Sequence, residues 1–101
     1  MPEEDPSTQL ESRVENGRYS VYVRQNITAN EIFLDIPSLI QTTVKIGVYN
    51  FQGYRLQTRV EGITPGENEY EIDLSQLAPG LYFIRVADFR SSQIIKVLLF
   101  D

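Results

Sequence analysis

The stretch Asp73–Val86, DLSQLAPGLYFIRV, decides the fold of this chain. It begins as a polar turn, tightens at Pro79-Gly80 and continues as an alternating strand with Tyr82 near its start. In β-sandwiches a tyrosine at such a place packs its ring over the core, while its hydroxyl donates to upstream backbone. The stretch therefore predicts a tyrosine corner, with Leu77 as a core plug, a type II turn at Pro-Gly and Tyr82 as the anchor.

Apolar and polar residues alternate on both sides of this corner, and turn signals separate the alternating runs. Alternation with period two predicts strands that are buried on one face, and short strands at regular spacing are typical of a sandwich. We therefore predict an all-β, Ig-like antiparallel β-sandwich of about seven strands over residues 19–101. The residues expected to face the core are Tyr19, Val21, Val23, Ile32, Leu34, Ile36, Val44, Ile46, Val48, Leu56, Thr58, Val60, Tyr70, Ile72, Leu74, Tyr82, Ile84 and Val86.

Residues 1–18 differ from the rest of the chain, because acidic residues outnumber basic ones and large apolar residues are few. Such a segment cannot bury enough apolar surface to offset its ordering entropy. We expect it to be a flexible acidic linker or tail, with the folded domain beginning at Tyr19.

The composition excludes several classes of function. The chain has 101 residues, a net charge of −5, no cysteine and no histidine. Binding to nucleic acid or to an anionic membrane needs clustered Lys and Arg, and no apolar run is long enough to span a bilayer. The usual general base, thiol nucleophile and zinc ligands are missing, so we predict no enzyme, no cofactor and no metal.

Two weak signals have competing interpretations. Glu67, Glu69, Glu71 and Asp73 recur at every second position, which suits either a cation such as calcium or, as we favour, a solvated strand face. The tripeptide Asn26–Thr28 matches an N-glycosylation sequon, a pattern that is common by chance.

Aromatic residues gather at one turn, where Tyr49, Phe51 and Tyr54 follow each other closely. Tyr22 and Phe33 are expected to point outward from their strands. Exposed aromatic side chains can form a platform for a sugar or a protein. The alternative, which we favour, is that they cover the rim of the sandwich or pack against a neighbouring domain.

Three motifs in order resemble a known family. The segments VKIGVYNFQGYRL, EYEIDLSQLAPGLYFIRV and SQIIKVLLF follow one another, and the last of them ends the sequence. This series resembles the C-terminal sorting domain of the type IX secretion system, found in cargo proteins of Bacteroidetes. The family's prolines before its second strand are missing here. The structural motif residues that match include Tyr49, Asn50, Gly53, Asp73, Leu77, Gly80 and Tyr82.

The resemblance implies a non-catalytic signal that directs an attached cargo protein through the periplasm to the cell surface or medium. Its implied partners are an outer-membrane shuttle or translocon and a sortase-like peptidase that would cut within residues 1–18. Since no signal peptide is visible, an exported chain is expected either to be a piece of a longer protein or to have lost its signal and gained a start methionine. An Ig-like carbohydrate- or protein-binding module of a bacterial surface protein is the alternative.

The last predicted strand, Gln93–Phe100, is apolar on both faces except at Lys96, so we expect it to be covered on both sides. A partner could read this strand by shape and by main-chain pairing. A homodimer through a strand edge is also plausible. The residues assigned to partner recognition are Lys96, Val97, Leu98, Leu99 and Phe100.

Overall fold

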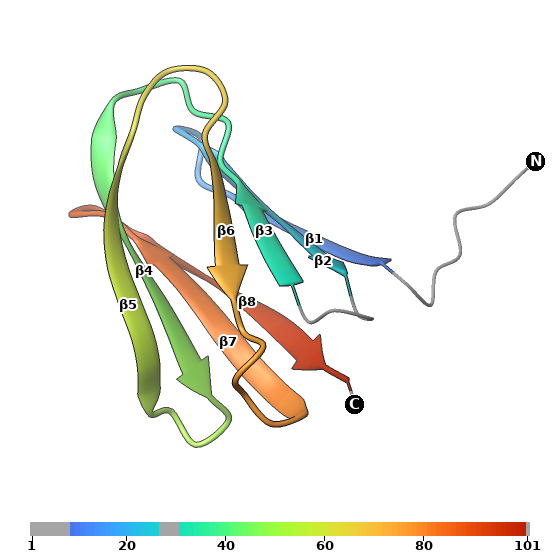
Figure 1. The fold of residues 1–101 in the computed structure, drawn as a ribbon. Coiled ribbons are helices and arrows are strands. Elements are labelled where there is room, and N and C mark those ends of the chain that lie inside the picture. Colours follow the sequence, from blue (N-terminus) through green and yellow to red (C-terminus); the bar gives the residue numbers. More distant parts are fainter. Residues whose placement is uncertain (1–8, 27–30, 101) are drawn as a thin grey trace, which may run out of the picture.

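Two antiparallel four-stranded sheets pack face to face in the computed structural model, which describes residues 9–26 and 31–100 (Figure 1). One sheet has the strand order β1-β2-β3-β6 and the other β5-β4-β7-β8. The prediction of an all-β sandwich is confirmed. The strands are β1 (Gln9–Glu15), β2 (Ser20–Asn26), β3 (Glu31–Asp35), β4 (Thr42–Asn50), β5 (Arg55–Ile63), β6 (Glu69–Asp73), β7 (Gly80–Ala87) and β8 (Ser92–Leu99).

Strand β1 raises the number of strands to eight and lies inside the segment expected to be a linker. It pairs with β2 along its whole length, from Gln9 opposite Asn26 to Glu15 opposite Ser20. Val14 packs against the core. Main-chain pairing, which does not depend on side-chain hydrophobicity, accounts for a strand that the composition of residues 1–18 did not predict.

The core lies between the sheets and consists of most of the side chains that alternation assigned to it. The assignment is wrong for β5, where Leu56, Thr58 and Val60 are exposed, because the register places Thr58 and Val60 opposite the outward positions of β4. The inward positions of β2, β3, β4 and β7 are buried, and Tyr70 on β6 is partly buried. Burying a large aliphatic side chain stabilises a fold by about 1.5–3 kcal/mol, so this layer is the main source of stability. Further members that close it are Ile63, Ile95, Val97 and Leu99.

Strand β8 is an edge strand, and only one of its faces is covered. Ile95, Val97 and Leu99 point into the core, whereas Ile94 and Leu98 are exposed on the opposite face. The prediction of a strand covered on both sides is therefore wrong. Within residues 9–26 and 31–100 no second layer packs on the outer face of this sheet, and its apolar side chains Ile94 and Leu98 are exposed.

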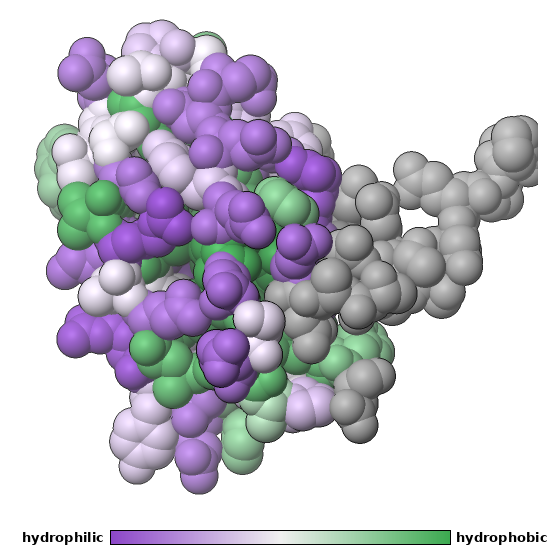
Figure 2. All heavy atoms as spheres, viewed as in Figure 1, coloured by the Kyte–Doolittle hydropathy of each residue, from purple (hydrophilic) through white to green (hydrophobic). Residues whose placement is uncertain are grey.

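Polar side chains close the open sides of the sandwich. On one side Gln57 Nε2 donates to the carbonyl of Asp73 at 3.1 Å, and Arg59 Nη1 donates to the carbonyl of Glu71 at 2.9 Å. Figure 2 shows mostly hydrophilic side chains on this side, around β5 and β6. On the other side the buried Gln25 donates to the carbonyl of Leu98. These bonds satisfy carbonyls at the edges of β6 and β8.

An ion pair between Arg18 and Asp88 joins the β1–β2 turn to the β7–β8 turn. The side chain of Asp88 is fully covered, and it also accepts hydrogen bonds from the main-chain N–H of Arg90 and Ser91 and from the hydroxyl of Tyr19. Burial alone would raise the pKa of Asp88, but these four donors outweigh it and hold the pKa well below its ordinary value. We call this group the turn clamp.

Candidate recognition surface

The tyrosine of the corner between β6 and β7 has the predicted geometry, but Gly80 does not have the φ of about +80° that the predicted type II turn requires. The hydroxyl of Tyr82 donates to the carbonyl of Ala78 at 2.6 Å, and its ring is buried. Gly80 has a φ of +149°, which residues other than glycine rarely adopt. Leu77 packs against the core. Asp73 accepts from the hydroxyl and the main-chain N–H of Ser75, which lowers the pKa of its carboxyl. The corner thus fixes the entry into β7.

The β4–β5 turn is held by Asn50. Its side-chain oxygen accepts from the main-chain N–H of Gln52 at 2.9 Å and of Tyr54 at 3.0 Å. Gly53 supplies the positive φ of +92° that this turn requires. Phe51 and Tyr54 are exposed at its tip, so these two aromatic side chains are accessible to a ligand.

Tyr49 lies on the outer face of its sheet, next to Gly47. A Cβ atom at Gly47 would stand 2.8 Å from Cε1 of Tyr49, so the absence of a side chain there makes room for the ring. Tyr49 is opposite Phe83 on β7, and cross-strand partners share one face. The two rings give the outer face of this sheet an aromatic centre.

The structure divides the residues assigned to partner recognition into two groups. Lys96, Leu98 and Phe100 are exposed, with Leu98 at 46% and Phe100 at 41% of full exposure. Val97 and Leu99 are buried in the core, 3% exposed each. Only the first group can touch a partner without unfolding of β8.

The outer faces of the two sheets carry opposite charge. Strand registers place Lys45, Arg85 and Lys96 on the outer face of β5-β4-β7-β8. Alternation of charged and apolar residues along β4, β7 and β8 could have revealed this arrangement, but only once the strand order was known. The side chains described on the outer face of β1-β2-β3-β6 are mainly acidic, and Arg24 is the basic residue among them. The acidic residues are Glu15, Glu31, Asp35, Glu69, Glu71 and Asp73.

The acidic run of β6 forms a strand face. Glu69, Glu71 and Asp73 are exposed and stand opposite Asp35, Phe33 and Glu31 of β3 in the strand register. Glu69 pairs with Arg24, whose guanidinium carbon lies 5.2 Å from the ring centroid of Phe33. Within residues 9–26 and 31–100 there is no group of acidic side chains placed to hold a metal ion.

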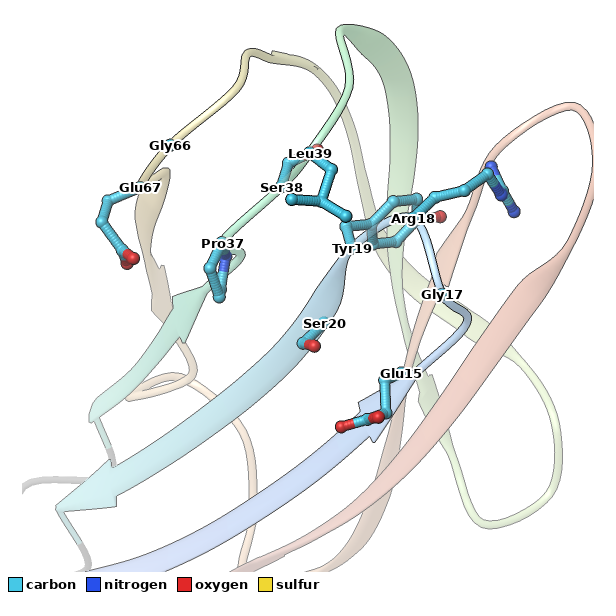
Figure 3. Close-up of a pocket in the computed structure, with 10 residues that line it drawn as sticks. All are labelled: Glu15, Gly17, Arg18, Tyr19, Ser20, Pro37, Ser38, Leu39, Gly66 and Glu67. Atoms are coloured by element: carbon cyan, nitrogen blue, oxygen red, sulfur yellow. The ribbon is translucent and has the colours of Figure 1, made fainter.

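A hollow of about 440 Å³ lies at the end of the sandwich where the β1–β2 turn meets the segments after β3 and before β6 (Figure 3). Its lining includes Glu15, Glu67, Pro37 and Leu39. Arg18, which also lines it, extends its side chain toward the β7–β8 turn, where it binds Asp88 (Figure 3). Because Arg18 is paired with Asp88, the described lining of this hollow offers no free cation to an anionic ligand.

Two features fall outside these surfaces. The sequon Asn26–Thr28 and the residues that follow it up to position 30 lie largely outside the described residues. No helix long and apolar enough to cross a membrane occurs in the described parts of the chain.

Comparison with protein families decides the assignment. Residues 25–99 match the Secretion system C-terminal sorting domain, which is the sorting domain of type IX secretion. The chain belongs to this family. The sorting domain thus acts as a C-terminal signal for type IX secretion and is a part of a secreted protein. Searches of curated proteins and of solved structures return no significant match.

The matched range is shorter than the folded part of the chain. It begins at Gln25 in β2 and ends at the last residue of β8, so β1 and most of β2 precede it. The match therefore does not cover β1, most of β2, or Arg18 and Tyr19 of the turn clamp, whereas Asp88 lies inside it.

Proposed function

We propose that this sorting domain is a non-catalytic address that guides an attached cargo protein across the periplasm to the outer-membrane shuttle and translocon of type IX secretion. The observation that supports this proposal is the exposed face of β8. Lys96 and Leu98 lie on this edge strand and Phe100 directly follows it; all three side chains are exposed, although two of them are large and apolar. Exposed apolar side chains that gather on one face mark interaction sites.

A partner would read β8 through these side chains rather than through its main chain. The carbonyl of Leu98 accepts from Gln25, whose side chain is buried, so this edge of β8 is partly occupied. Adding a strand there would require Gln25 to leave and to remain buried without a partner, which costs about 1–3 kcal/mol. The outward side chains need no such rearrangement.

A sortase-like peptidase is the second proposed partner, and it would cut before Gln9. Peptidases need an extended, accessible segment, and residues 9–15 are held in β1 while Asn16 and Arg18 belong to hydrogen-bonded turns. Cleavage on the N-terminal side of Gln9 releases the cargo and leaves the sandwich whole.

Strand β5 supports the proposal of a homodimer. It is an edge strand of nine residues, and most of them are exposed. A long exposed edge pairs readily with another strand, so two copies could join their β5 edges into a continuous sheet.

We predict that a fluorescent reporter fused between a signal peptide and residues 1–101 reaches the medium or cell surface of a bacterium with type IX secretion. A Leu98→Ser/Phe100→Ser variant should lose at least about tenfold of this export, because both side chains meet the partner and neither belongs to the core. The measurement is fluorescence in the medium and on intact cells, compared with an isogenic strain that lacks the translocon.

The control is Leu39→Ser, which removes an apolar side chain that has the size of Leu98, is more exposed and lies outside β8. It should leave export unchanged. Retention of the folded wild-type fusion in the periplasm would contradict the proposed function, whereas full export of the Leu98→Ser/Phe100→Ser variant would contradict only the role of β8.

A ligand-binding module is the second candidate function, and the exposure of Phe51 and Tyr54 favours it. If these rings stack on sugars, the domain should bind particular glycans on an array. A Phe51→Ala/Tyr54→Ala variant should then lose that binding while keeping its melting temperature, since neither side chain is in the core. A domain that binds none of the glycans would leave this candidate without support.

A further inference from the structure

The outer face of β5-β4-β7-β8 combines basic side chains with aromatic and apolar ones. In the strand register Lys45 is opposite Ala87, Gly47 is opposite Arg85, and Phe83 is opposite Lys96. Because cross-strand partners share a face, these residues lie together on the side away from the core. We call this surface the basic face; its members are Lys45, Tyr49, Phe83, Arg85, Ile94, Lys96 and Leu98.

The cations of the basic face have no acidic partners in the described part of the chain. None of the ion pairs found there involves Lys45, Arg85 or Lys96. Asp88 is the carboxylate that lines a hollow together with Lys45 and Arg85, but its side chain is covered and paired with Arg18. A chain with a net charge of −5 thus concentrates uncompensated positive charge on one sheet.

A shallow hollow of about 370 Å³ lies at one end of the basic face. Lys45 and Arg85 contribute to its lining, together with the apolar side chains of Val60 and Phe89. Val60 is 62% exposed and Phe89 is 87% exposed, so both are available to a partner. The hollow therefore combines two cations with an apolar rim, which suits a carboxylate carried on an apolar segment.

We propose that the basic face is a docking surface for a protein that presents acidic side chains beside apolar ones, with a carboxylate entering the hollow between Lys45 and Arg85. This inference rests on the proposed function, because the partner would belong to the secretion machinery. The inference extends the proposed contact surface from β8 across β7 to β4, and it requires a partner with acidic and apolar side chains. Arg and aromatic residues are enriched in the cores of protein interfaces, and opposite charges speed docking.

A protein fits this surface better than an anionic membrane or a second copy of the chain. The net charge of −5 repels the whole domain from an anionic bilayer, whereas a protein partner contacts only the basic face. The acidic face of a second copy has matching charge, but such a head-to-tail contact would lead to rings or open filaments rather than to a closed dimer.

The test uses the full chain in the reporter fusion, with Lys45→Glu/Arg85→Glu on the basic face. Export should fall by at least about tenfold, because the partner's acidic groups would then meet like charges. The opposite-face control is Glu69→Lys/Glu71→Lys, which should be exported as the wild type is. A fourfold variant that carries both pairs of changes restores the net charge and should still fail to be exported.

Purified variants must first keep their melting temperature within about 5 °C of the wild type, which limits the loss of stability to about 1 kcal/mol. Normal export of a folded Lys45→Glu/Arg85→Glu variant would overturn the docking surface while leaving the sorting function intact. Failure of the wild-type fusion would instead count against the sorting function itself.

A photo-crosslinking residue in place of Thr43, which lines the hollow, identifies the occupant during export. A cross-link to a different protein through an acidic segment supports the proposal. A cross-link to a second copy of the chain, to lipid, or to no partner would overturn it.

Discussion

Replacing Asp88 with alanine is expected to lower the free energy of unfolding by about 3–5 kcal/mol, the usual cost of breaking a buried ion pair by removing one partner. The carboxylate is fully covered and accepts from Arg18, from the hydroxyl of Tyr19 and from two main-chain N–H groups. Alanine leaves all of these donors without their acceptor. Small domains have about 5–15 kcal/mol of stability, so urea unfolding should show a large shift of the midpoint.

The exposed pair of Arg24 and Glu69 is the matched control for this substitution. Its nitrogen–oxygen distance is 2.9 Å, but the Glu69 side chain is 67% exposed. Since solvent screens such pairs, Glu69→Ala should cost at most about 1 kcal/mol. Equal losses in the two variants would mean that the turn clamp does not hold the two turns together.

The same carboxylate makes stability depend on pH. The pKa of Asp88 lies well below its ordinary value of 3.8 in the folded chain, so the unfolded chain takes up its proton first as the pH falls. The stabilisation is therefore complete above about pH 5 and declines below about pH 4. The wild type should therefore lose its advantage in unfolding free energy over Asp88→Asn as the pH falls below about 4.

Alternation along the sequence was sufficient to predict most of the core and the tyrosine of the corner, although it assigned the wrong face of β5 to the core. A strand with one buried face repeats every second residue, and this pattern is local. Ile32, Leu34 and Ile84 could therefore be assigned to the core without knowledge of their neighbours, and all three are fully buried. The Tyr82 hydroxyl bond is equally local, since its acceptor Ala78 is only four residues away.

Strand order and edges could not be predicted in this way, because they depend on residues far apart in the sequence. The apolar run of β8 fits a strand covered on one face as well as a strand covered on both, and Leu98 is exposed because no described segment packs on the outer face of its sheet. Gln25 reaches Leu98 across 73 residues, and Arg18 reaches Asp88 across 70. The basic face requires the same information, since three strands supply its cations.

A fragment that begins at Tyr19, the boundary predicted from composition, is expected to lose at least about 5 kcal/mol relative to the full chain. It lacks β1, the core contact of Val14 and the Arg18 partner of Asp88. Removing Arg18 leaves a buried charge unpaired, and removing β1 exposes the edge of β2. We expect residues 19–101 to be largely unfolded or aggregated at 25 °C. Circular dichroism and urea unfolding measure this.

A fragment of residues 9–101 is the matched control, because it keeps β1 and the turn clamp. Its free energy of unfolding should lie within about 1 kcal/mol of that of the full chain. Introducing Asp88→Asn into residues 19–101 separates the two causes of the loss. If the unpaired charge dominates, this substitution recovers part of the stability, since a neutral amide costs less to bury than a carboxylate. A fragment 19–101 as stable as the full chain would show that β1 is dispensable and that the folded domain does begin at Tyr19.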